Sequence, residues 1–325
     1  MQRRQFIQAA GAAALGALAG PALAGAAPAV RITLPSPGSA GSAWRALIER
    51  HGLNTDPSLS LNWVTADPGK MQVQLSAGSL DVGVFGAVGL ATLANRGSDI
   101  VLFGPALNNH GRWLVRGDSP FRKPADLLGK TIATTDESSE TYQQARIAAS
   151  LIGIDLKKDV KVIHGSPTAN LALFERGDVD AIITLEPTAT RVVARGAREI
   201  ARVADIWKQA TGQHEDPILL GLAANRAWYE ANRATAAKLV ALLQRVNGLV
   251  RREPASLLAI ASQIGLKPDE TKAAGLLPSR LAPAYATRWD ESVFAVIDKQ
   301  VEVAAKLGVI DRVPSRKLYV GAGAA

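Results

Sequence analysis

Short apolar runs alternate with longer segments whose apolar residues recur at helical spacing through the first two thirds of the chain. Runs of this kind are typical of β-strands, and the longer segments are typical of amphipathic helices, so the alternation indicates an α/β fold. The predicted strands cover residues 31–34, 59–64, 82–85, 100–103, 130–134, 160–164 and 179–184, with another apolar run at 218–223. The predicted helices cover residues 71–77, 86–96, 124–128, 138–151, 168–176 and 188–195, and an earlier one carries Trp44, Leu47 and Ile48.

The pattern changes to helical from residue 227 onward, and residues 289–307 predict a last amphipathic helix. Two similar strand-helix sets precede this helical part, and 325 residues exceed the size at which single cores stop growing, about 250–300. We therefore expect two lobes, with crossings near residues 112–114 and 220–223. The expected division is lobe 1 at 28–112 plus 223–325, and lobe 2 at 113–222.

Residues 1–27 have the features of an export signal. An Arg-Arg-x-Phe-Ile run begins at Arg3 and is a twin-arginine signature, an Ala-, Gly- and Leu-rich stretch follows at 9–20, and Ala-Leu-Ala at 22–24 is typical of a cleavage site. The stretch is only mildly apolar and is interrupted by glycines, which disfavours a stable membrane span. An uncleaved N-terminal anchor helix is the alternative.

Composition excludes several function classes. With 47% hydrophobic and 20% charged residues the chain has enough apolar material for packed cores, and with no cysteine it has no disulfide, thiolate metal site or cysteine nucleophile. The net charge of +8 falls to +6 if Arg3 and Arg4 leave with the leader. No basic cluster interleaves with aromatic residues, so nucleic-acid binding is not expected.

Motifs for catalysis or cofactor binding are missing from the sequence. His51, His110, His164 and His214 lie far apart without acidic or histidine partners at metal-binding spacing, so no metal site is expected. Gly-Lys-Thr at 129–131 lacks the first glycine of a phosphate loop and begins a predicted strand. No dinucleotide fingerprint or nucleophile elbow is present, and we expect no cofactor and no catalysis.

Loops that lead from a strand into a helix are the most suggestive feature. Unpaired N–H groups and the helix dipole favour anions at helix N-termini, and ligands of open α/β sheets lie beyond the carboxyl ends of strands. Each loop can also simply cap its own helix. The candidate loops cover residues 36–42, 85–87, 136–139 and 164–166.

Several runs resemble one family of binding proteins. Leu-Ser-Ala-Gly-Ser-Leu-Asp-Val-Gly at 75–83 is similar to a turn of type II periplasmic binding proteins. Together the runs resemble the nitrate/sulfonate/taurine group of ABC-transporter substrate-binding proteins, which includes binders of thiamine-pyrimidine precursors. The likeness extends from about residue 31 to 195. Four further runs carry it, at residues 113–120, 124–133, 153–160 and 177–187.

This resemblance implies a two-lobed α/β fold with a ligand cleft between the lobes, a two-strand hinge, and delivery of the ligand to a membrane permease. Arg112 and His164 join the candidate site as groups that could offset carboxylates in the cleft. The binding positions that carry over from the family are Pro37, Gly38, Ser39, Ala40, Phe85, Gly86, Ala87, Asp136, Glu137, Ser138, Ser139 and Glu186.

The chain departs from the family at one helix start. Residues 135–140 read Thr-Asp-Glu-Ser-Ser-Glu, where the family usually has a Gly-Ser/Thr-rich start. Carboxylates there either stabilise the helix by about 0.3–1 kcal/mol or face the cleft, where they favour a ligand with an amine or another donor. Glu186 is the acidic residue most expected to touch the ligand, because Pro187 fixes its turn.

We therefore expect an exported, periplasmic and monomeric solute-binding protein for a small organic sulfonate or taurine-like molecule. Its expected partners are the permease and ATPase of an ABC importer, and it meets the membrane only through the permease. A pyrimidine or another nitrogen-containing or aromatic ligand is an alternative. An enzyme on the same fold is another, although relatives such as precursor synthases and desulfinases depend on cysteine. A sensor or scaffold without transport is a third.

Overall fold

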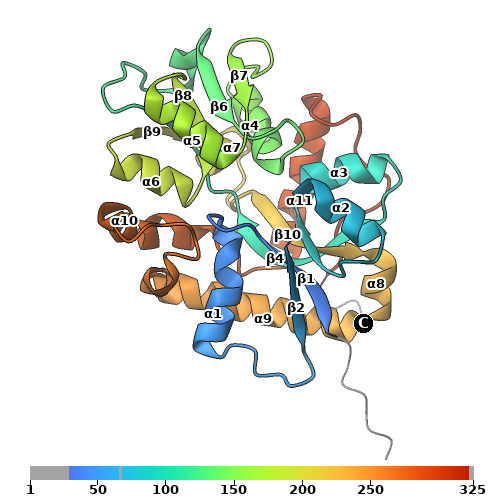
Figure 1. Ribbon diagram of the computed structural model, residues 1–325. Helices are drawn as coiled ribbons and strands as arrows, with labels where there is room; N and C mark the ends of the chain where they lie inside the picture. Colours follow the sequence, from blue (N-terminus) through green and yellow to red (C-terminus); the bar gives the residue numbers. More distant parts are fainter. Residues whose placement is uncertain (1–28, 66–67, 322–325) are drawn as a thin grey trace, which may run out of the picture.

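The computed structural model describes residues 29–65 and 68–321, and the predicted leader lies outside them. Two α/β lobes are visible, the second drawn in green to yellow-green above the first (Figure 1). The strands are β1 Val30–Leu34, β2 Leu61–Thr65, β3 Gly83–Phe85, β4 Ile100–Asn108, β5 Gly111–Val115, β6 Thr131–Thr134, β7 Lys161–His164, β8 Ala181–Leu185, β9 Arg198–Arg202 and β10 Ile218–Asn225.

Helices cover the sheets and make up most of the chain after β10. The α-helices are α1 Ala43–His51, α2 Pro68–Ser76, α3 Ala87–Asn95, α4 Glu140–Leu151, α5 Pro167–Arg176, α6 Thr188–Ala194, α7 Val203–Thr211, α8 Arg226–Ala231, α9 Arg233–Arg252, α10 Thr271–Leu281 and α11 Glu291–Lys306. The 3-10 helices are η1 Ala40–Ser42, η2 Pro124–Leu127, η3 Pro254–Ile260 and η4 Ala282–Ala284.

The two lobes repeat one strand arrangement. In the first lobe β1 and β2 pair in parallel, a bridge from Ile32 to Val82 links them to the β3 edge, and β10 lies antiparallel between β3 and β4. In the second lobe the order is β7-β6-β8-β5-β9, with β5 antiparallel to both of its neighbours. In each lobe, therefore, the strand that enters from the other lobe is the antiparallel one.

The chain passes between the sheets after β4, at Asn109 and His110, and again between α7 and β10. Both passages precede the predicted crossings, because Trp113 and Leu222 are fully buried core residues of β5 and β10 rather than linker residues. The bounds of the two sheets thus place Arg112 in the second lobe and residues 218–222 in the first.

Most predicted elements are present within a few residues of their expected bounds. The helix expected at 124–128 is only the short 3-10 turn η2, and β5, β9 and α7 are not among the predicted elements. Strand β9 reads Arg-Glu-Ile-Ala-Arg, because it is an edge strand: Glu199 and Arg202 form ion pairs, and Arg198 donates to backbone carbonyls.

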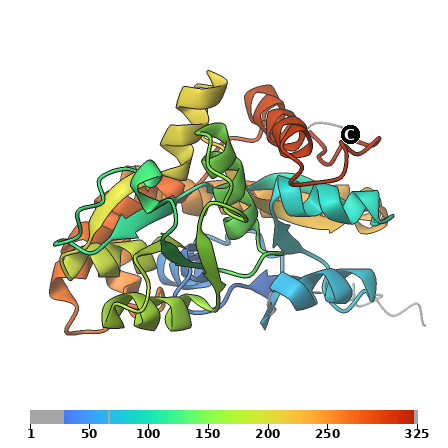
Figure 2. The same cartoon turned by 90° about the horizontal axis from the view of Figure 1, so that it is seen from above.

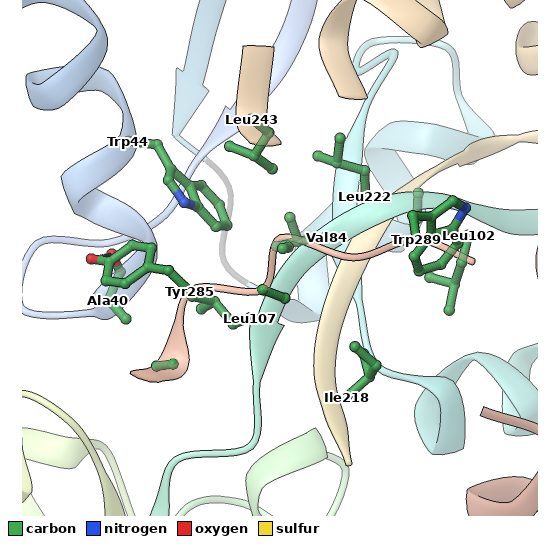
Figure 3. Packing of buried hydrophobic residues seen from close by; sticks show 14 of the residues in the cluster. Ala40, Trp44, Val84, Leu102, Leu107, Ile218, Leu222, Leu243, Tyr285 and Trp289 are labelled. Carbon is green, nitrogen blue, oxygen red and sulfur yellow. Dashed lines mark hydrogen bonds between the residues drawn. The ribbon is translucent and has the colours of Figure 1, made fainter. Parts of the chain in front are cut away.

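The core of the first lobe joins the C-terminal helices to the N-terminal sheet. Figure 3 shows Leu222 of β10 and Leu102 of β4 within this cluster, and it places Tyr285 beside Ala40. The Tyr285 hydroxyl donates to the Ala40 carbonyl over 2.8 Å. Buried Asn247 of α9 donates to two backbone carbonyls, so its amide nitrogen is satisfied inside the core. The helical C-terminal third is therefore part of lobe 1.

Candidate functional site

The two lobes meet at two helix contacts on opposite sides of the passage between the sheets. Helix α3 of the first lobe packs against α4 of the second, and α10 of the first packs against α6 of the second (Figure 1). Helix α11 of the first lobe packs beside α3, and the two helices are neighbours in both views (Figures 1 and 2). We call these the α3–α4 contact and the α6–α10 contact.

At the α3–α4 contact a carboxylate from one lobe lies on the helix N-terminus of the other. Glu140, the first residue of α4, accepts hydrogen bonds from the Gly89 amide at 2.8 Å and, more weakly, from the Val88 amide at 3.4 Å. Both amides belong to the first turn of α3. First-turn N–H groups have no partner within their own helix, so this arrangement satisfies two of them with an anion.

Gly86 makes this approach possible. It is the N-cap residue of α3, and a Cβ atom at this position would overlap the carboxyl group of Glu140. Gln144, one turn further along α4, donates to Glu140 Oε1 over 2.8 Å. Burial raises the pKa of Glu140, whereas the bonds from Gln144 and the two α3 amides act in the opposite direction. The carboxylate is thus held by neutral donors.

The α6–α10 contact is built from side-chain charges. Glu186 is buried, its Oε2 accepts from the amide and the hydroxyl of Thr190, and its Oε1 lies 2.8 Å from Arg280 Nη2 of α10. Arg280 also donates to Glu199 of β9 over 2.7 Å. Arg112 lies on the other side, with Nε 3.5 Å from Glu186 Oε1. Burial lowers the pKa of Arg112, against the attraction of both carboxylates.

A second ion cluster extends the same contact toward solvent. Glu270, just before α10, accepts from Arg191 Nε at 2.9 Å and from Arg195 Nη2 at 2.8 Å, and both arginines belong to the α6 region of the other lobe. Arg195 also pairs with Glu175 of α5. The arginines of this contact therefore already have carboxylate partners.

His110 occupies one of the two passages between the lobes. Its ring is buried, and Nδ1 lies 2.8 Å from the Asn108 carbonyl. Burial lowers the pKa of His110 to about 4, while nearby Glu186 acts to raise it and Arg112 to lower it. The ring is therefore neutral at physiological pH and belongs to the ion network.

The predicted acidic helix start has a different arrangement from the expected one. Asp136, Glu137 and Ser138 are exposed, and Ser139 caps α4 by accepting from the Tyr142 amide. Glu137 pairs with Lys157 at 3.1 Å. The carboxylate at the lobe junction is thus that of Glu140, which lies one residue beyond the predicted set.

The other predicted positions fall into separate groups. His164 lies near Glu137: the His164 Nε2 atom is 3.8 Å from Glu137 Oε1, and the His164 Nδ1 atom is 2.7 Å from the Thr135 carbonyl.

In the first loop, Ala40 is buried and its carbonyl accepts a hydrogen bond from the Tyr285 hydroxyl, whereas Pro37 is exposed. The structure therefore unites Gly86 and Ala87 with the start of α4, and Arg112 with Glu186. The remaining predicted members of the first loop are Gly38, at φ 86°, and Ser39, which donates to the Ser36 carbonyl, while Phe85 is half-buried at the end of β3.

Sequence reasoning missed Glu140 and Arg280. Glu140 follows the capping serine of α4, so in the sequence it is indistinguishable from an ordinary acidic residue in a first helical turn. Arg280 lies in the helical C-terminal third, for which the sequence predicted only packing. No local signal identifies either residue, because each meets its partners across the lobe junction.

A surface hollow of about 430 Å³ lies elsewhere, on the second lobe, and Arg116 and Arg195 are among its lining residues. Arg116 already donates to the Val179 carbonyl, and Arg195 pairs with Glu175 and Glu270. Both arginines of this hollow thus already have partners, which makes the lobe junction the stronger candidate site.

Within residues 29–65 and 68–321, no three histidine or acidic side chains gather in a way that would hold a metal ion. In the same ranges no helix is both long and apolar enough to cross a membrane.

Comparison with known proteins identifies the family. The NMT1-like family model matches residues 87–265, which include both passages between the lobes. The chain belongs to the NMT1-like family. The fold is that of two-lobed periplasmic binding proteins: the aliphatic sulphonate binding protein SsuA from Escherichia coli superposes with a TM-score of 0.70 at 21% identity, covering 90% of this chain and 92% of that one.

Two further solved structures share the fold. The alkanesulfonate-binding protein SsuA from Xanthomonas axonopodis pv. citri, bound to MOPS, has a TM-score of 0.70 at 21% identity and covers 90% of this chain and 96% of its own. A desulfurization enzyme has a TM-score of 0.58 at 14% identity, covering 88% of this NMT1-like chain and 94% of the enzyme. At these identities the likeness shows the fold alone, and the fold hosts both binding proteins and an enzyme.

The curated relatives include ATP phosphoribosyltransferases and a periplasmic binding protein. An ATP phosphoribosyltransferase of Nitratidesulfovibrio vulgaris strain Miyazaki F is 32% identical over 56% of this chain, which spans 65% of that protein. The one from strain Hildenborough is 30% identical over 85% of each chain. The taurine-binding periplasmic protein of Escherichia coli K12 is 28% identical over 42% of each chain.

Proposed function

We propose that this NMT1-like protein is an exported, periplasmic and monomeric solute-binding protein that captures a small organic sulfonate or taurine-like molecule between its lobes and delivers it to the permease and ATPase of an ABC importer. The family, the two-lobed fold and the taurine- and sulfonate-binding relatives support this proposal. The twin-arginine pattern at Arg3 supports the export route.

The observation that carries the proposal is the α3 N-terminus at the lobe junction. Its Val88 and Gly89 amides already bind the carboxyl oxygens of Glu140, and the other described donor to this carboxyl group, Gln144, is neutral. Donors of this kind bind a sulfonate by the same physics, because they recognise negative oxygens rather than one chemical group. A ligand with about seven heavy atoms could gain roughly 10 kcal/mol at the limit for small ligands, enough for sub-micromolar binding.

The names of the N. vulgaris relatives favour a second candidate, an ATP phosphoribosyltransferase. A triphosphate substrate needs several free cations or a metal to offset its charge. At the α6–α10 contact, Arg112, Arg191, Arg195 and Arg280 each lie within 3.5 Å of a carboxylate oxygen. The charge distribution therefore favours a ligand with a single anionic group, and we rank the enzyme second.

The decisive experiment is a calorimetric screen of the purified chain from residue 28. We expect taurine or a short alkanesulfonate to bind with a dissociation constant below about 10 μM, and nitrate and pyrimidines to bind more weakly. No heat with any sulfonate from a chain that melts cooperatively would contradict the proposal. Incubation with ATP and a phosphoribosyl donor, followed by mass spectrometry for phosphoribosylated ATP, tests the enzyme directly.

A further inference from the structure

The Glu140 carboxylate lies where an anionic ligand group would bind. It extends from α4 of the second lobe to the first-turn amides of α3 in the first lobe, so its hydrogen bonds cross the junction. A ligand oxyanion that used the same amides would have to displace it. Gly86 offers no side chain in this space, which the Glu140 carboxyl group fills.

The surroundings of Glu140 supply donors but no compensating charge. Gln144 and the α3 amides are neutral, and among the residues that the structure describes Glu140 forms no ion pair with a lysine, arginine or histidine. At the other contact, each carboxylate has at least one guanidinium within 3 Å. An ionised Glu140 displaced by the ligand would lie close to the incoming anion, and none of its present partners carries a positive charge.

We propose that Glu140 sets the charge selectivity of the site: it disfavours sulfonates with a neutral tail and admits amino sulfonates, whose ammonium group pairs with the displaced carboxylate. This inference rests on the proposed function, because it assumes that a sulfonate uses the α3 amides. Like charges at close range disfavour binding, and an opposite charge on the ligand removes that cost. Glu140 is thus a specificity-determining residue that acts through charge.

Taurine and isethionate separate the two effects, since they differ only in an ammonium against a hydroxyl group on the same two-carbon sulfonate. We expect the unmodified chain to bind taurine at least tenfold more tightly than isethionate in calorimetry. Glu140→Gln keeps the shape and removes the charge, so isethionate should tighten tenfold or more and the preference should disappear. Glu137→Gln is the matched control: this glutamate lies in the loop that leads into α4, three residues before Glu140, but it is exposed and paired with Lys157, and the ratio of the two affinities should stay unchanged.

Glu140→Ala serves as the second charge-removing variant if Glu140→Gln does not melt cooperatively. A taurine-to-isethionate ratio that is the same in the unmodified chain and in the Glu140 variants, while both ligands bind, would overturn this inference and leave the proposed function standing. Failure of the unmodified chain to bind taurine while another sulfonate binds would overturn this inference alone, and failure to bind any sulfonate would overturn the proposed function and this inference with it. A ratio that collapses in the Glu140 variants and not in Glu137→Gln supports the inference.

Discussion

The two contacts between the lobes use opposite chemistry. At the α3–α4 contact one carboxylate meets backbone amides, with no cation among its described partners. At the α6–α10 contact, guanidinium groups of Arg191, Arg195 and Arg280 meet carboxylates from the other lobe. The first contact is open to exchange, because any oxyanion can take the place of a side-chain carboxylate on backbone donors.

The second contact is closed to exchange. Its charges are ion-paired with one another, so a ligand that took the partner of Glu186 or Arg112 would leave a buried charge short of a partner. From this difference we expect the α6–α10 contact to stabilise the fold and the α3–α4 contact to change when a ligand binds. Changes in the former should therefore affect folding most, and changes in the latter should affect binding.

The largest effect is expected for Glu186→Ala. The substitution removes a buried carboxylate that both Arg112, which is buried, and Arg280, which is half-buried, contact, and it leaves them Glu199 as a carboxylate partner. The loss of one member of a buried pair typically costs about 3–5 kcal/mol. Urea unfolding should show this loss in the free energy of unfolding. Glu175→Ala, which removes a surface partner of Arg195, is the control and should cost less than about 1 kcal/mol. Equal losses in the free energy of unfolding for the two variants would contradict the stabilising role of the α6–α10 contact.

A smaller effect, which depends on pH, is expected from His110 in the same network. Its pKa in the folded chain is about 4, against an ordinary 6.5, because burial disfavours the charged ring. As the pH falls below 6.5 the unfolded chain binds a proton that the folded chain does not, so stability falls between pH 6.5 and 4, by up to ~3 kcal/mol. This contribution is zero at pH 8, where the ring is neutral in both states.

His110→Asn tests this expectation, since the amide can still donate to the Asn108 carbonyl. Urea unfolding at pH 8 measures the packing cost of the substitution alone. Relative to that value, the variant should lose less stability than the unmodified chain on going to pH 4.5. Parallel pH profiles for the two proteins would show that His110 does not contribute to acid sensitivity.

The fold was largely predictable because buried strands of a doubly covered sheet appear as plain apolar runs, as at residues 179–184 and 218–223. Strand β9 was not, since its charged residues hide the strand pattern and Glu199 finds a partner distant in sequence, Arg280. The site was harder to predict for the same reason. Glu186 was identified from its turn with Pro187, a local feature, but its cluster with Arg112 and Arg280 depends on the approach of the lobes.

The smallest of these effects, and the most specific, concerns Gly86. Its φ of −88° suits any residue, so Gly86→Ala introduces no backbone strain, and the three atoms nearest to the new methyl group all belong to Glu140. We expect a cost of about 1–3 kcal/mol in the unmodified chain, the usual range for an overpacked site. In a Glu140→Ala background the same substitution should cost less than about 0.5 kcal/mol, because the obstructing group is gone.

Urea unfolding of the two single variants, the double variant and the unmodified chain forms a double-mutant cycle that isolates the coupling between Gly86 and Glu140. Gly275→Ala is the control of opposite sign: it lies in the exposed middle of α10 with open space around its Cα, so alanine should stabilise by about 0.5–1 kcal/mol. A large cost for Gly86→Ala that persists without Glu140 would mean that another group fills the space. A cost that vanishes there would show that the Glu140 side chain occupies the α3 N-terminus in solution, as the α3–α4 contact requires.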